Sequence, residues 1–153
     1  MAVGRLRPAF RAACDEYLAR IGRYVTIRET EVREAGRAGS PQVQRREEGR
    51  AIRAALPPRV VRVALDIDGQ TWSSEQLAER MRDWRDGARD LAFVIGGAVG
   101  LDDPIRNDAD QRWSLGPLTL PHELARVVVV EQLYRAFTIL RGEPYHKGAD
   151  RAG

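Results

Sequence analysis

The sequence predicts an α/β domain in which helices flank a mostly parallel sheet, and three observations lead to this class. Short apolar segments typical of strands alternate along the chain with segments of helical periodicity. The 153 residues are 43% hydrophobic and 31% charged, which suits one domain with one sizeable core. Because no repeat or linker divides the chain, we expect a single domain over residues 1–153.

The first third of the chain predicts two helices with a strand and a loop between them. Residues 8–23 carry apolar side chains at helical spacing, and residues 24–32 alternate apolar and polar side chains as a strand does. Residues 34–40 hold two glycines and a serine and are typical of a loop. A charged helix then spans residues 42–56, and the two prolines that follow end it.

The middle of the chain predicts a strand, a turn and a capped helix. The strand covers residues 59–66, and Asp68-Gly69 forms the turn. Ser73 begins the next helix, with Gln76 three residues later as in a capping box. Gly87 ends this helix.

The last third predicts two short strands and two helices. Residues 91–95 form an apolar strand of the buried kind, residues 104–112 a short helix, and residues 118–120 a brief strand. Pro121 opens the final helix and Gly142 ends it. Four consecutive valines within that helix favour a strand locally, but the helical apolar pattern continues beyond them and outweighs this preference.

The charges are distributed unevenly between the two parts of the chain. Residues 1–62 hold 14 arginines and 7 acidic residues, a net charge of +7, whereas residues 63–153 have a net charge of −4. A basic half is typical of a protein that meets a polyanion, although an arginine-rich solvated surface explains it equally well. The arginines expected to capture RNA phosphates are Arg5, Arg7, Arg11, Arg45, Arg46, Arg50 and Arg53.

Cysteine content and hydropathy predict a cytoplasmic protein. Cys14 is the only cysteine, so no intrachain disulfide forms, which fits a reducing compartment. The N-terminus lacks the pattern of a secretory signal, and the most apolar stretch, residues 124–140, contains three charged side chains. We therefore expect no membrane partner. No matched set of cysteines and histidines predicts a metal site.

Three segments are candidates for ligand binding, because ligands bind at the carboxyl ends of parallel strands. They are the segment after Leu65, the segment after Ile95, and residues 113–120. Gly96 and Gly97 let backbone N–H groups approach a ligand closely. Their G-G-x-x-G spacing is neither the dinucleotide fingerprint nor a P-loop. A tight turn without a ligand accounts for these glycines equally well.

Residues 113–122, with the sequence WSLGPLTLPH, combine apolar side chains with residues that force an irregular backbone path. Such a cradle suits an adenine ring, which needs a flat slot and a few backbone hydrogen bonds. The alternative is a loop whose leucines fill the core, and without further context that alternative is favoured.

The C-terminal tail carries side chains suited to RNA chemistry. Tyr145 can stack on a base, Lys147 can meet a phosphate, and His146 can take or hold a proton near neutral pH. For an arbitrary protein, a frayed terminus is the preferred explanation.

The order of four motifs, IGGxxG, WSLxxLTLPH, EQLYRA and PYH, resembles that of the RlmH family of SPOUT-class methyltransferases, which act on large-subunit ribosomal RNA. The resemblance is closest over residues 93–147. It extends over residues 63–90 and over the sequence DEYL at residues 15–18, so that nearly the whole chain is covered. Each motif alone is weak, but the four in this order are specific.

This resemblance implies an α/β fold with a C-terminal trefoil knot, and a homodimer whose active site lies near the subunit interface. It implies S-adenosylmethionine as methyl donor without a metal. The implied substrate is a pseudouridine of 23S ribosomal RNA in the assembled ribosome, methylated on ring nitrogen 3. The glycine loop and the resemblance together predict these cofactor-binding residues: Leu65, Gly96, Gly97, Leu115, Gly116, Pro117, Leu118, Thr119 and Leu120.

Chemical type suggests three catalytic roles in such a reaction. The imide nitrogen must lose its proton, so we expect a general base and assign this role to His146. Tyr145 is expected to stack on the target base, and Arg135 to stabilise negative charge on the uracil carbonyls. A non-catalytic RNA-binding or ribosome-binding module is the alternative from another class. The third possibility, a dinucleotide-dependent enzyme, is disfavoured by the glycine spacing.

Overall fold

Parallel pairing, predicted from the sequence, is found between all the strands of the computed structural model, which describes residues 1–37 and 39–145. β3 (Val61–Thr71) lies between β4 (Leu91–Val94) and β5 (Gln111–Ser114) in a three-stranded sheet. The predicted α/β class is therefore confirmed.

Two short strands extend this sheet on the β4 side. β1 (Ala2–Val3) pairs with β2 (Glu31–Val32), and a parallel bridge joins Ala2 to Ile95, the residue that follows β4. The Val3 N–H donates to the carbonyl of Ile95 over 3.3 Å. All five strands consequently form one continuous layer.

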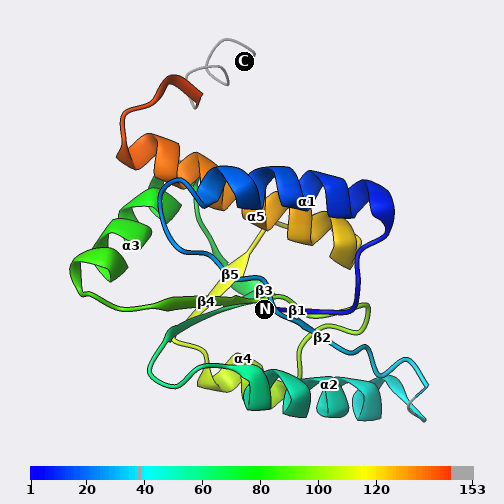
Figure 1. The fold of residues 1–153 in the computed structure, drawn as a ribbon. Coiled ribbons are helices and arrows are strands. Elements are labelled where there is room, and N and C mark those ends of the chain that lie inside the picture. Colours follow the sequence, from blue (N-terminus) through cyan, green and yellow to red (C-terminus); the bar gives the residue numbers. More distant parts are fainter. Residues whose placement is uncertain (38, 146–153) are drawn as a thin grey trace.

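Helices cover both faces of this layer (Figure 1). The helices α1 (Pro8–Ile21), α3 (Ser74–Asp86) and α5 (His122–Leu140) pack together on one face. The helices α2 (Pro41–Ala55) and α4 (Asp103–Asp108) lie on the other. None of the helices in the described part of the chain is long and apolar enough to cross a bilayer.

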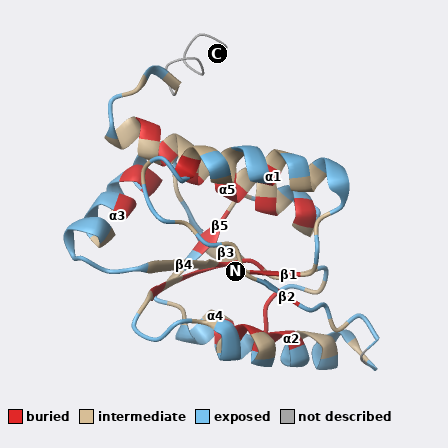
Figure 2. Ribbon diagram, in the orientation of Figure 1, coloured by how far each residue is buried: buried red, intermediate tan, exposed pale blue. Residues whose placement is uncertain are grey.

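A hydrophobic core lies on each face of the sheet. The buried residues are red in Figure 2. Val63 is fully buried toward α3 and α5, whereas its neighbour Ala64 belongs to the cluster formed with α2 and α4. Successive residues of a strand point to opposite faces, so β3 supplies both cores at once. An apolar run without alternation is the sequence signature of such a strand.

The helix signals in the sequence are confirmed. Ser73 Oγ accepts from the Gln76 N–H over 3.1 Å, and the Gln76 side chain accepts from the Ser73 N–H over 2.8 Å, forming the predicted capping box. α5 includes the four valines and ends before Gly142, whose φ is +67°. Gly87 follows α3 as expected.

Two predicted strands and one predicted turn are wrong. Of residues 24–32, only Glu31 and Val32 form a strand; Tyr24 instead stacks on Phe137 of α5, with ring centroids 5.3 Å apart. Residues 118–120 form no strand, because the partner that β3 takes is Gln111–Ser114.

The predicted turn at Asp68-Gly69 lies within β3, where the pairing with β5 skips from Leu65 to Gln70. Both Leu65 and Gln70 pair with Trp113, so the residues between them bulge out of the ladder. The predicted short helix also ends earlier than expected, at Asp108, which frees Gln111–Ser114 to form β5.

Candidate active site at the carboxyl edge of the sheet

The strand register places the three predicted loop segments along one edge of the sheet. Ala64 pairs with Val94, so Leu65 lies beside Ile95, and Leu65 also pairs with Trp113. Neighbouring strands are about 4.8 Å apart. The segment that begins at Gly96 and the segment that follows Trp113 therefore lie on either side of Leu65 at this edge of the sheet.

A hollow of about 280 Å³ lies at this edge, between the ends of β3 and β5 and helix α5. Its lining residues are Thr71, Trp72, Trp113, Ser114, Leu115, Gly116, Val128 and Gln132. The rings of Trp72 and Trp113 stack with centroids 5.5 Å apart and planes 12° apart. The hollow thus combines atoms of two tryptophans with the backbone of an irregular loop, although Trp113 is only 3% exposed and the guanidinium carbon of Arg80 lies 4.4 Å from the centroid of the Trp72 ring.

The segment after β5 divides into a part that lines this hollow and a part that faces solvent. Gly116 has a φ of +109°, a backbone conformation that favours glycine, and its N–H donates to Ser114 Oγ over 3.1 Å. Leu115 and Gly116 line the hollow, whereas Leu118 is 76% exposed. Pro117 and Thr119 are also exposed and Leu120 is half-buried.

The glycine loop after β4 is held tightly against its surroundings. A Cβ on Gly96 would lie 2.7 Å from the carbonyl carbon of Gly100, and one on Gly97 would lie 3.0 Å from Cγ1 of Val3. Both glycines are thus required by close packing of the chain itself. They lie beside β1 and not in the wall of the hollow.

Two of the three predicted catalytic residues meet at one carboxylate. Tyr145 Oη donates to Glu131 Oε1 over 2.9 Å, and Arg135 Nη2 donates to the same oxygen over 2.8 Å. Burial, together with the hydrogen bond to Glu131, raises the pKa of the Tyr145 phenol far above its usual range. The third predicted residue, His146, lies outside the described residues, as does Lys147.

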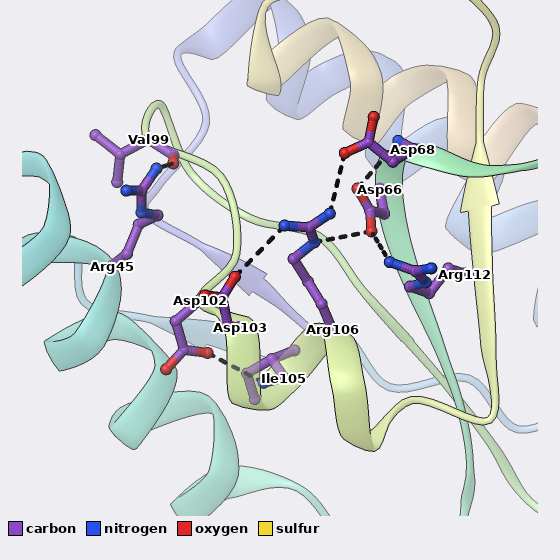
Figure 3. Close-up of polar contacts among 9 residues, drawn as sticks. All are labelled: Arg45, Asp66, Asp68, Val99, Asp102, Asp103, Ile105, Arg106 and Arg112. Carbon is purple, nitrogen blue, oxygen red and sulfur yellow. Dashed lines mark hydrogen bonds and ion pairs between the residues drawn. The ribbon is translucent and has the colours of Figure 1, made fainter.

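A network of charged side chains holds the bulge of β3 (Figure 3). Arg106 of α4 donates from Nε to Asp66 over 2.8 Å and from Nη2 to Asp68 over 3.1 Å, and Arg112 lies 3.3 Å from Asp66. Burial alone would raise the pKa of Asp66, but the hydrogen bonds from Arg106 and from the Asp68 N–H outweigh it and lower that pKa. The sequence pattern did not predict this network.

Trp72, Gln132 and Arg106 are among the residues near the edge that sequence reasoning did not identify. The EQLYRA motif contains Gln132, but neither its apolar pattern nor the family resemblance predicts a role for this side chain. Trp72 follows a strand that continues to Thr71, beyond the apolar pattern of its inner part. Arg106 approaches Asp66 from 40 positions away, a contact that no local pattern encodes.

The predicted RNA-binding arginines differ in how their charges are used. Arg7 donates to Glu123 over 2.8 Å, and Arg11 pairs with Asp15 and Glu29. Arg53 pairs with the buried Asp102, and Arg45 donates to the carbonyl of Val99. Arg5 and Arg46 are exposed, and Arg50 pairs with the exposed Glu47. The guanidinium groups of Arg46 and Arg50 on α2 are therefore open to solvent.

Across residues 1–37 and 39–145, no three His, Cys, Asp or Glu side chains are grouped to hold a metal ion.

Comparison with known proteins gives concordant results. A family model described as "Predicted SPOUT methyltransferase" matches residues 1–146. A relative from Anaeromyxobacter sp. (strain Fw109-5), named ribosomal RNA large subunit methyltransferase H, is 49% identical over 148 residues, covering 96% of this chain and 97% of the relative.

Relatives with the same name occur in Xylella fastidiosa (strain 9a5c) and Stenotrophomonas maltophilia (strain R551-3). The first is 47% identical over 135 residues, covering 87% of this chain and 85% of the relative. The second is 43% identical over 150 residues, covering 96% of each. The family match extends over all the residues from which the sheet, its helices and the edge described above are built, and the chain belongs to the SPOUT methyltransferase family.

Proposed function

We propose that this chain is an S-adenosylmethionine-dependent methyltransferase that modifies ring nitrogen 3 of a pseudouridine in 23S ribosomal RNA. We propose further that it acts as a homodimer on assembled ribosomes in the cytoplasm, and that its C-terminal half forms a trefoil knot. The observation that carries the proposal is the hollow at the carboxyl edge, whose wall includes the start of the WSLGPLTLPH segment. Relatives 43–49% identical to the chain are named for methylation of large-subunit ribosomal RNA.

The shape of the edge fits an adenosine-containing donor. Trp72 and Trp113 contribute apolar atoms to the wall of the hollow, and Leu115 and Gly116 contribute backbone groups beside them. Leu118, 76% exposed, lies on the same loop and can cover an apolar ligand when one is bound. We assign cofactor binding to residues 115–120 and to Leu65 and the glycine loop, which lie at the same edge of the sheet but outside the wall of the hollow. When bound, S-adenosylmethionine supplies an electrophilic methyl group on its sulfonium.

The residues of the chain then have to orient the target base and handle one proton. Alignment of the reacting atoms alone contributes about 7–11 kcal/mol of barrier reduction in favourable cases. The proton on ring nitrogen 3 must leave, and a phenol with a raised pKa is a poor base near neutral pH. Tyr145 therefore keeps its proton and serves to stack on the base, which leaves His146 as the proposed general base.

Arg135 is placed to act electrostatically, but its charge is shared. Its Nε and Nη2 atoms both donate to Glu131 Oε1, over 3.1 Å and 2.8 Å. Two of its five N–H donors are thereby used, and Nη1 is left to stabilise an anionic carbonyl of the uracil ring.

Two apolar side chains support the homodimer. Leu118 and Leu124 are 76% and 37% exposed, and they lie on the loop after β5 and on the first turn of α5. A second copy of the chain would remove both from water and bring a second tail near the edge. Capture of ribosomal RNA is assigned to the exposed arginines of α2 and to Arg5.

The direct test is mass spectrometry of 23S ribosomal RNA from cells with and without this gene. We expect one methylated pseudouridine to disappear on deletion and to be restored by the wild-type gene. Calorimetry of the purified protein with S-adenosylmethionine separates the alternative. If the protein binds ribosomes but shows no measurable cofactor binding, the chain is a non-catalytic RNA-binding module instead of an enzyme.

A further inference from the structure

Glu131 stands out because four hydrogen bonds from three residues converge on its carboxylate. Oε1 accepts from Arg135 Nε, Arg135 Nη2 and Tyr145 Oη, over 3.1, 2.8 and 2.9 Å. Oε2 accepts from Gln132 Nε2 over 2.7 Å. The side chain is only 18% exposed, so these bonds are partly shielded from water.

The two oxygens of Glu131 face different parts of the molecule. Oε1 accepts hydrogen bonds from Tyr145 of the C-terminal tail and from Arg135 of α5. Oε2 holds Gln132, which lines the hollow at the carboxyl edge. Gln132 Oε1 in turn accepts from Ser74 Oγ on α3 over 2.6 Å. A continuous chain of hydrogen bonds therefore runs from the tail, through Glu131, to the wall of the hollow and the start of α3.

An ordinary helix-surface ion pair does not account for this arrangement. Glu131 and Arg135 have the i,i+4 spacing of such pairs, which contribute little to stability when exposed. Here the Glu131 carboxylate also accepts a hydrogen bond from the phenol of Tyr145, which lies outside the helix, and one from the side-chain amide of Gln132. In addition, the guanidinium carbon of Arg135 lies 4.8 Å from the centroid of the Tyr145 ring, and the Tyr134 ring meets the Tyr145 ring at 63°.

We infer that Glu131 is a positioning residue that ties Tyr145 and Arg135 to the cofactor hollow through Gln132. Its acceptor oxygens fix where the phenol and the guanidinium stand relative to the hollow wall. It does not touch the reacting atoms. The kinetic consequence rests on the proposed function, because it assumes that the hollow holds the methyl donor and that the tail meets the base.

The test is a double-mutant cycle between Glu131→Gln and Tyr145→Phe, measured by methylation of ribosomes. Each single variant is expected to lower kcat by about 10-fold, the scale of one hydrogen bond to a charged group, with the cofactor Kd within about threefold of wild type. If the phenol acts through Glu131, the kcat of the double variant is no lower than that of the more impaired single variant. Reductions in kcat that multiply would overturn the inference.

A second readout does not depend on activity. Because the Glu131 carboxylate contributes to the raised pKa of Tyr145, Glu131→Gln should bring that pKa down toward the usual value. Ultraviolet titration, with the Tyr145→Phe protein subtracted to isolate this phenol, measures the change. An unchanged titration would show that Glu131 does not hold the phenol.

Asp86→Asn is the control, because it removes an exposed ion pair, that with Arg85 at the end of α3. It should leave kcat and the Tyr145 titration unchanged. If Glu131→Gln fails to fold, Tyr145→Phe alone still tests the link, since it deletes only the phenolic O–H. A wild-type protein that binds no cofactor and methylates nothing defeats the proposed function, whereas active Glu131→Gln and Tyr145→Phe variants with wild-type kcat defeat this inference alone.

Discussion

Gly49 lies in the middle of α2 because the carboxylate of Asp102 occupies the space where a side chain would be. Asp102 is buried, caps α4 by accepting from the Ile105 N–H over 3.2 Å, and pairs with Arg53. A glycine in a helix interior costs about 1 kcal/mol relative to alanine. The close approach of α2 to the cap of α4 therefore outweighs helix propensity at this position.

Gly49→Ala should for this reason destabilise the protein although alanine is the better helix former. The new methyl group displaces the Asp102 carboxylate, and overpacking of this kind costs about 1–3 kcal/mol. Urea unfolding followed by circular dichroism measures the change. Gly39→Ala is the control, because a Cβ at Gly39 would meet nothing within 4 Å. A Gly49→Ala protein more stable than wild type would show that α2 and α4 separate easily.

Asp66 makes stability depend on pH in the acid range. Its folded-state pKa lies below the unfolded value of about 3.9, so its ion pair with Arg106 contributes fully above that value. The contribution disappears as the pH falls through the lowered folded-state pKa. In Asp66→Asn, the fall in unfolding free energy between about pH 5 and pH 2 should be shallower than in wild type. Denaturation at a series of pH values tests this.

Asp68→Asn provides the comparison, since Asp68 pairs with the same arginine but its side chain is 72% exposed. Because solvent screens this ion pair, the unfolding free energy of Asp68→Asn should fall with decreasing pH about as much as that of wild type. Equal effects of the two substitutions would show that burial of Asp66 has no part in the pH dependence.

Among the elements, those with local stop and start signals were predictable and those decided by distant partners were not. The cap of α3 and the glycines that follow α3 and α5 are encoded within a few residues. β5 was not predicted because its partner, β3, lies more than 40 positions earlier in the chain. The side chains of residues 24–32 alternate as in a strand, yet Glu29 and Glu31 both turn to the buried Arg126 of α5. A polar partner from another element cannot be read from periodicity.

The site divides in the same way. The segment after Trp113 joins this edge through β5, which was not predicted, but placing Leu65 and Gly96 side by side at the edge was within reach of sequence reasoning. The separation of Leu115 and Gly116 from the exposed Pro117–Thr119 was not, because it depends on the φ of +109° at Gly116. The convergence of Tyr145 and Arg135 on Glu131 likewise needed the packing of the tail against α5.

The capping box of α3 gives a prediction for this element. Ser73→Ala removes the acceptor of the Gln76 N–H and should cost about 1 kcal/mol of stability. Because α3 packs against α5, the destabilisation should appear in the global melting temperature. Differential scanning calorimetry compares it with Thr26→Ala, a substitution at an exposed position. Equal melting temperatures for the two variants would mean that water replaces the cap without cost.

Across the whole molecule, the sheet separates an α2 face with solvent-exposed arginines from an α3 face on the opposite side. Each phosphate that an arginine neutralises releases counterions, so ribosome binding should weaken steeply as salt rises.

The double variant Arg46→Gln, Arg50→Gln should lower affinity at low salt and reduce the slope of log K against log salt by about one unit for each arginine that meets a phosphate. Arg82→Gln with Arg85→Gln is the matched control, since both residues are exposed on α3. Equilibrium binding to ribosomes at several salt concentrations measures the slopes, and cofactor affinity should stay constant in both variants. A reduced slope for the α3 pair with a wild-type slope for the α2 pair would place the RNA on the opposite face of the sheet.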